Sequence, residues 1–128
     1  MRHLIFSVLL SSLCFACTNQ DVKVDVKKSQ SHYKLAVELA QLNLFKNALE
    51  EFNLAIKFDP DNPKLYRKKG IILFGMKNYE EAKINFQKTI GLNPEDIQAH
   101  INLGMAHYTS GNKTKALESW KYAVGLKP

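Results

Sequence analysis

The chain has 128 residues, a formal net charge of +6 and a sequence pI near 9.3. Its hydrophobic content of 45% is enough for one compact domain with a single elongated core. The lysines are scattered and no nucleic-acid-binding motif is present, so the positive charge indicates a solvated surface and excludes a nucleic-acid partner. Cys14 and Cys17 are the only cysteines, and both lie near the N-terminus, which excludes a disulfide from the folded part.

Residues 1–16 are typical of a secretory signal peptide, because Arg2 and His3 precede an uncharged run that ends at residue 16. This run is shorter than the about 20 apolar residues of a membrane-spanning helix. Cys17 follows a small residue and precedes polar chain, and this junction resembles the cleavage site of bacterial lipoproteins. The resemblance implies that Cys17 is the lipid attachment site. Two alternatives stay open: an ordinary secretory signal with incidental cysteines, and a CxxC redox or metal motif that lacks further ligands.

The polar, charged residues 17–28 are predicted to form a lipidated, disordered tether. Their isolated valines alternate with charged residues, but no second strand is available to pair with them.

The remaining sequence predicts an all-α fold. Ala48, Phe52, Ala55 and Ile56 fall at i, i+4, i+7 and i+8, which places them on one helix face. The same patterning and the turn residues between segments predict six helices, at residues 30–42, 46–58, 63–76, 80–91, 97–110 and 114–126.

A period of 34 residues relates these helices in pairs. It links the prolines 60, 94 and 128, the alanines 48, 82 and 116, the aromatics Phe52, Phe86 and Trp120, and the small residues Ala36, Gly70 and Gly104. Such a period indicates an array of stacked helical hairpins, in which the alanines mark the points where two helices cross closely.

The third unit carries His100-x2-Leu103-Gly104-x2-His107, followed by Ala116-x3-Trp120. This pattern resembles the tetratricopeptide repeat (TPR). The resemblance covers about residues 29–128 and implies an α-solenoid of three TPR hairpins, over 29–62, 63–96 and 97–128. It also implies a binding scaffold whose partner is a protein or peptide, without fixing which one.

The resemblance further implies that the first helix of each hairpin lines a concave peptide-binding groove. The positions that it assigns to this groove are Tyr33, Lys34, Val37, Gln41, Lys64, Arg67, Lys68, Ile71, Phe74, Gln98, Ile101, Asn102, Met105 and Tyr108. An apolar stripe and a basic cluster at positions 64, 67 and 68 are expected there, and Arg67→Glu is expected to weaken partner capture without changing melting. Ordinary packing and a solvated face are the alternative interpretations. Val37 replaces the asparagine of the family's carboxylate clamp, which disfavours a C-terminal-peptide clamp.

No catalytic site, metal site or cofactor is predicted. His100 and His107 lie seven apart on one helix face, but they occupy core positions of the repeat and no third ligand is evident. The sequence therefore predicts a non-enzymatic protein.

The predicted function is a membrane-anchored lipoprotein scaffold of the bacterial envelope, facing the periplasm, that acts as an adaptor or assembly factor. The alternative is an accessory or regulatory subunit that positions an envelope enzyme or a pilus or secretion component, as a pilotin does. The sequence shows no polar capping helix before Pro128, so self-association through Leu117 and Val124 of the last helix is also expected.

Overall fold

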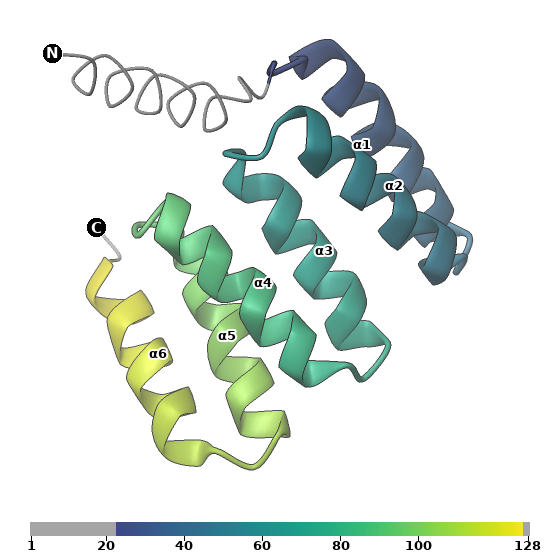
Figure 1. Cartoon of the computed structure of the whole chain (residues 1–128). Helices are drawn as coiled ribbons and strands as arrows, with labels where there is room; N and C mark the ends of the chain where they lie inside the picture. Colours follow the sequence, from purple (N-terminus) through teal and green to yellow (C-terminus); the bar gives the residue numbers. More distant parts are fainter. Residues whose placement is uncertain (1–22, 127–128) are drawn as a thin grey trace, which may run out of the picture.

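The computed structural model describes residues 23–126, so the predicted signal peptide and the predicted lipid attachment at Cys17 lie outside the described residues. Within 23–126 the chain forms helices and no strand, which confirms the all-α prediction (Figure 1). The six helices are α1 (Val26–Gln41), α2 (Phe45–Phe58), α3 (Pro63–Gly75), α4 (Tyr79–Leu92), α5 (Ile97–Thr109) and α6 (Lys113–Leu126).

Helix α1 begins about one turn earlier than predicted, so residues 26–28 are helical and do not belong to a disordered tether. The Asp25 side chain caps this helix by accepting a hydrogen bond from the Lys28 backbone N–H at 3.0 Å. The Asp25 backbone N–H donates to the carbonyl of Phe58 at 2.9 Å, which joins the helix start to the end of α2. Ser29 is 2% exposed, and its hydroxyl donates to another carbonyl of α2. Capping and docking together therefore extend the helix into the polar segment.

Each hairpin turns at a residue with positive φ, and these three residues are also 34 positions apart. They are Asn43 (φ 59°), Lys77 (φ 64°) and Gly111 (φ 91°). Asparagine and glycine tolerate this left-handed conformation, whereas lysine adopts it at an energetic cost. The repeat thus imposes one turn geometry on three different residue types.

Small residues allow the two helices of a hairpin to approach closely. Ala48, Ala82 and Ala116 are all fully buried, as the period predicts. A Cβ atom added at Gly70 would lie 2.6 Å from Cε1 of Phe86, and one added at Gly104 would overlap the Trp120 indole. The crossings in the second and third hairpins therefore have no room for a methyl group.

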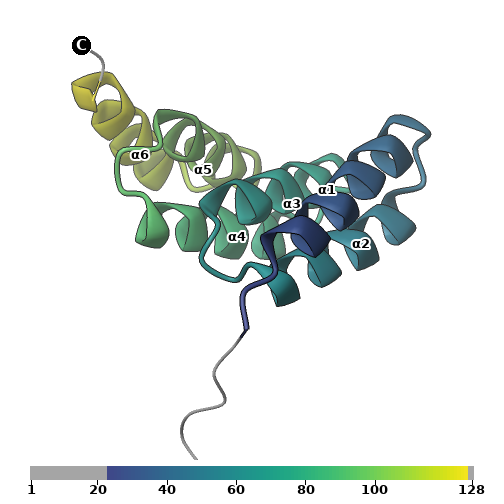
Figure 2. The same cartoon turned by 90° about the horizontal axis from the view of Figure 1, so that it is seen from above.

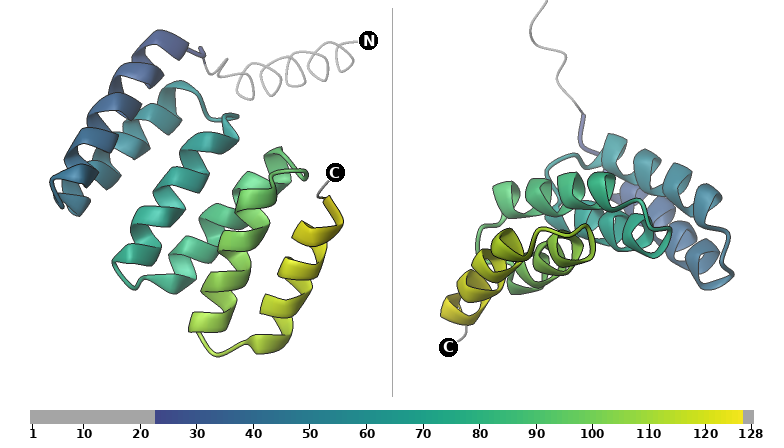
Figure 3. Two further views of the ribbon diagram at one scale, coloured as in Figure 1. Left: turned by 180° about the vertical axis from the view of Figure 1, so that it is seen from behind. Right: turned by 90° about the horizontal axis from the view of Figure 1, so that it is seen from below.

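The hairpins stack in chain order into a curved array, with α1, α3 and α5 on the inner side of the curve (Figure 2). Helices α2 and α4 lie on the outer side, as the view from below also shows (Figure 3). Leu73, Phe86 and Leu103 belong to one buried cluster, which makes the second and third hairpins a continuous core. Among residues 23–126, none of the helices is both long and apolar enough to cross a membrane.

Candidate functional site

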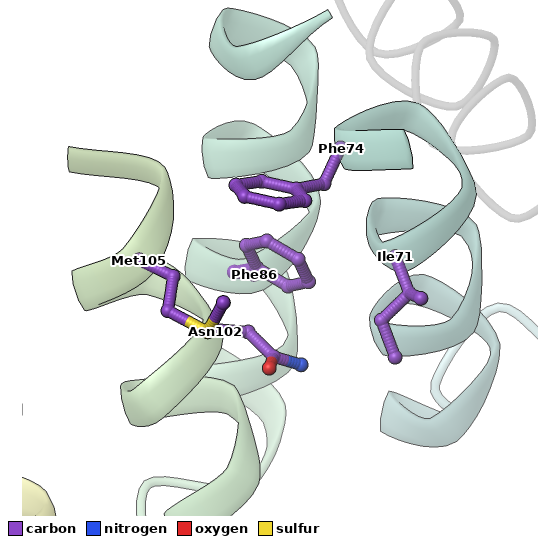
Figure 4. Close-up of a pocket in the computed structure, with 5 residues that line it drawn as sticks. All are labelled: Ile71, Phe74, Phe86, Asn102 and Met105. Carbon is purple, nitrogen blue, oxygen red and sulfur yellow. The ribbon is translucent and has the colours of Figure 1, made fainter. Parts of the chain in front are cut away.

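Two apolar hollows lie side by side on the inner face and share Ile71. The first, between α3 and α5, has a volume of about 180 Å³ and contains Phe74, Asn102 and Met105 (Figure 4). The second, of about 250 Å³, lies between α1 and α3. Seven predicted groove residues line one or both hollows: Val37, Gln41, Lys68, Ile71, Phe74, Asn102 and Met105.

The groove exposes large apolar side chains on a rigid helical frame. Ile71 is 38% exposed, Met105 is 45% exposed and Tyr108 is 53% exposed. The Tyr108 ring leans on Trp120 of α6, with the ring centroids 5.9 Å apart. Exposed apolar groups gathered on one concave surface are typical of a site that binds another molecule.

The basic cluster differs from the expectation because Arg67 is engaged elsewhere. Its Nε donates to Oδ2 of Asp96 at 3.1 Å, and both side chains are largely buried. Asp96 also caps α5 by accepting from the backbone N–H of Ala99 at 2.9 Å. Arg67 therefore braces the second hairpin against the third, and the expectation that Arg67→Glu leaves melting unchanged conflicts with this contact.

The groove retains two lysines at its α1 end. The Lys64 ammonium lies 4.7 Å from the centre of the Tyr33 ring, a cation–π contact between the first two hairpins. Tyr33 itself packs edge-on against Phe52, with centroids 6.1 Å apart. Lys68 lines the second hollow and forms no ion pair with any residue between 23 and 126. The positive charge available to a ligand thus comes from positions 64 and 68, together with the exposed Lys34 of α1.

Ile101 lies on another part of the surface from the groove hollows. It lines a third hollow between α5 and α6, together with Trp120 and Val124, of about 200 Å³. Its carbonyl accepts a hydrogen bond from the Trp120 indole at 3.2 Å. Lys34 and Gln98 are exposed at the groove surface, and Gln98 donates to the carboxamide oxygen of Asn102 at 3.1 Å.

Two aromatic residues of the groove floor were not among the predicted site positions. Phe52 lies under the second hollow and Phe86 under the first. Both occupy the repeated aromatic position of the outer helices, which the period identifies as core. Their size could have indicated that they also line the groove, because an aromatic ring that packs within the hairpin is large enough to reach the inner face.

His100 has a structural partner within the described part of the chain, whereas Nδ1 of the buried His107 makes no hydrogen bond to residues 23–126. Nε2 of His100 donates to the carbonyl of Pro94 at 2.8 Å, and the Tyr66 hydroxyl, one repeat earlier, donates to the carbonyl of Pro60 at 2.7 Å. His107 is 8% exposed, and burial lowers its pKa below the ordinary value of 6.5. No group of three or more His, Cys, Asp or Glu residues between 23 and 126 gathers to hold a metal ion.

Stacked hairpins with an inner apolar groove define a helical-repeat protein of the solenoid class. Two models of the same family, described as tetratricopeptide repeat, match residues 29–62 and 67–128. The chain therefore belongs to the tetratricopeptide repeat family, as its sequence pattern indicates.

Two curated relatives match this chain over a small share of their own length. The chain is 38% identical to human Protein O-mannosyl-transferase TMTC3 over 78 residues, which is 60% of this chain and 8% of that protein. It is 29% identical to the Hsp70-Hsp90 organizing protein of Triticum aestivum over 84 residues, 66% of this chain and 14% of that protein. This chain thus spans a small part of either relative's length.

Among solved structures, the first TPR of Spaghetti (RPAP3), bound to the HSP90 peptide SRMEEVD, is similar with a TM-score of 0.79. The two are 19% identical, and the match covers 83% of this chain and 84% of that one. At this identity the likeness establishes the fold.

Proposed function

We propose that this protein is a non-catalytic interaction scaffold that holds a peptide segment of a partner protein in its inner groove. The observation that carries the proposal is the pair of hollows joined at Ile71, with apolar side chains exposed along them. Exposing Met105 and Tyr108 side by side on one helix does not stabilise the free protein, whereas covering them would stabilise a complex with a ligand. The peptide-bound structure of the similar Spaghetti domain supports the same use of the fold.

The groove favours an extended segment over a folded surface. Its hollows follow one another along the inner face of α1, α3 and α5, so a ligand that fills both must run across the helices (Figure 2). An extended chain spans at most about 3.3–3.6 Å per residue and presents successive side chains in opposite directions. Lys64 and Lys68 at one end favour a segment that carries acidic side chains there.

Crosslinking in cells tests this function. A photoreactive phenylalanine analogue replaces Tyr108 in the groove, and the same analogue replaces Gln87, an exposed residue of the outer helix α4, as the matched control. We expect a discrete protein to crosslink at position 108 and not at position 87. Equal capture at both positions, or none at position 108, would refute the groove as the binding site.

The proposal places this scaffold in the bacterial envelope as an adaptor or assembly factor, anchored in a membrane by a lipid on Cys17 and facing the periplasm. What supports this is the sequence of the leader, in which Cys17 follows a small residue. Labelling with a palmitate analogue in bacterial cells should mark the wild-type chain and the Cys14→Ser variant but not Cys17→Ser. If the Cys17→Ser variant were still labelled, Cys17 would not be the lipid attachment site.

We further propose that the outward face of α6 docks on a second copy of the chain. Leu49 of α2 and Ile90 of α4 pack against the core cluster. Their counterparts in the third repeat, Leu117 and Val124, are 52% and 68% exposed. Val124→Glu should lower the mass found by sedimentation, while Ile84→Glu, at a residue 62% exposed on α4, should not. A wild-type monomer at tens of micromolar would end this proposal.

The second candidate function is an accessory or regulatory subunit that positions an envelope enzyme, or a pilus or secretion component as a pilotin does. The groove serves this role equally, and the difference lies in the captured protein. Capture of a hydrolase whose activity changes on binding would favour this candidate over an assembly factor.

A further inference from the structure

The third hairpin carries an apolar surface on the side away from the second hairpin. Its hollow of about 200 Å³, between α5 and α6, is lined in part by Trp120 and Val124. One period earlier, Phe86 and Ile90 hold the equivalent positions, and both pack in the cluster that contains Leu103 of the third hairpin. Leu103 is only 8% exposed. The hollow between α5 and α6 therefore has the form of a seat for the leucine of another inner helix.

Helix α1 presents such a leucine, and no residue between 23 and 126 buries it. Leu35 lies two periods before Leu103 on the equivalent face of its helix and is 43% exposed. Leu42, the C-cap residue of α1, is 69% exposed. Helices α1 and α6 lie at opposite ends of the array (Figure 1). The leucines of α1 and the hollow beside α6 thus cannot meet within one copy of the chain.

The contact between the second and third hairpins shows what would lie opposite Leu42. There, Nζ of Lys83 donates to the hydroxyl of Ser110 at 3.3 Å. The counterpart of Lys83 one period later is Leu117, which is 52% exposed, and the counterpart of Ser110 two periods earlier is Leu42. Lysine and serine serve at these positions inside the array, so the fold does not require leucine at either. Two exposed leucines thus occupy the positions that would face each other if a second copy extended the array.

We infer that copies of this protein stack head to tail, with α1 of one copy seated on α5 and α6 of another. Leu35 fills the hollow beside Trp120, and Leu42 packs against Leu117. Such an interface is heterologous, because it joins two different surfaces and leaves one of each free at the ends of the assembly. The inner groove then continues from α5 of one copy to α1 of the next. The inference rests on the proposed self-association through α6, for which it names the surface that α6 and α5 receive.

One residue of α1 opposes this stacking and so marks its geometry. Glu38 is exposed in the single chain, and its counterpart two periods later is Ala106, which is 0% exposed. Stacking would therefore remove the Glu38 carboxylate from water, which costs free energy. Glu38→Ala should consequently strengthen association by about threefold or more. The control Glu50→Ala, at an exposed residue of the outer helix α2, should leave association unchanged.

Sedimentation velocity of the full chain tests the inference. The average mass of the wild type should rise with concentration beyond that of a dimer, because each added copy leaves a free surface. Leu35→Lys places in α1 the residue that the second repeat holds as Lys69, so the fold should be kept. We expect this variant to associate at least about tenfold more weakly. The matched control Ile84→Lys, at a residue 62% exposed on α4, should associate as the wild type does.

A mixing experiment establishes that the two surfaces differ. Leu35→Lys blocks the α1 surface and Val124→Glu blocks the α6 surface, so each variant alone should remain monomeric. An equal mixture retains one intact pair of surfaces and should therefore form dimers that do not grow further. A mixture that stays monomeric, or a wild-type mass that stops at a dimer, would overturn head-to-tail stacking. Unchanged association of Glu38→Ala would also contradict it.

Failure of this inference is distinguishable from failure of the proposals on which it rests. If Leu35→Lys associates as the wild type does and Val124→Glu does not, self-association through α6 stands and the role of α1 is wrong. If the wild type is a monomer at tens of micromolar, self-association itself fails and the inference fails with it. The groove is tested separately by capture at Tyr108 and survives either result.

Discussion

Gly70→Ala isolates the packing constraint on which the hairpin geometry depends. The added Cβ would lie 2.6 Å from Cε1 and 2.9 Å from Cδ1 of Phe86, against an optimal carbon–carbon separation of about 3.5–4.0 Å. Phe86 is 1% exposed, so its ring has little room to withdraw. Helix propensity alone would favour alanine by about 0.5–1 kcal/mol. Overpacking of a core costs about 1–3 kcal/mol, which outweighs this gain.

Gly91→Ala supplies the matched control, because a Cβ there meets nothing within 4 Å. We expect Gly91→Ala to stabilise the fold by about 0.5–1 kcal/mol and Gly70→Ala to destabilise it by about 1–2 kcal/mol. Each kcal/mol corresponds to roughly 4–8 °C in melting temperature for a domain of this size. Thermal and urea unfolding followed by circular dichroism measure both variants.

A double-mutant cycle identifies the ring as the cause. Phe86→Leu removes the edge that meets the new methyl group, so the cost of Gly70→Ala should shrink in that background. If Gly70→Ala instead stabilises the chain as Gly91→Ala does, the close approach of α3 and α4 is not a constraint and the reasoning is refuted.

Three further outcomes follow from single contacts. Arg67→Glu should lower the free energy of unfolding in urea by about 1–3 kcal/mol, because the new carboxylate would face Asp96. The control Lys64→Glu, at an exposed residue, should change it by no more than about 0.5 kcal/mol. Equal losses in the two variants would show that the Arg67–Asp96 contact does not stabilise the fold. Lys77→Gly should stabilise by up to about 1 kcal/mol by relieving a positive φ, and unchanged melting would argue against that strain. Burial lowers the pKa of His107, so the unfolded chain binds its proton first and stability should fall as the pH drops below about 6.5. His107→Leu should flatten that fall in pH-dependent melting, and an identical pH profile would contradict the assignment.

The repeat period predicts the helices and the core because both depend on which face of a helix is apolar. Ala48 and Phe86 are buried as their spacing requires. The start of α1 was missed because a cap at Asp25 and a contact to Phe58 decide it, and neither has a periodic signal. Local capping therefore sets boundaries that hydrophobic periodicity leaves undetermined.

The groove was predicted less completely because long side chains choose among partners that sequence spacing does not reveal. Arg67 lies on the expected helix, but Asp96, the N-cap residue of the following helix α5, engages it. Ile101 is one residue from Asn102, and the 100° turn between neighbours is enough to place it toward α6 instead. Phe86 reaches the groove from an outer helix, which no rule based on the inner helices would include.

We infer from these differences that the ligand specificity of the array depends on positions whose residue type is not determined by core packing. Alanine recurs at the crossing points because only a small residue fits, so positions 48, 82 and 116 carry no information about the ligand. At positions 34, 68 and 102 the repeat accepts Lys34, Lys68 and Asn102 in turn, and two of these line the hollows. Because the buried repeated positions maintain the fold, substitutions at the remaining inner-helix positions can change which ligand the groove binds with little effect on stability. The exchange Asn102→Lys would test this view: because lysine occupies the equivalent positions 34 and 68, the melting temperature should change little, while the groove should come to favour segments that carry acidic side chains.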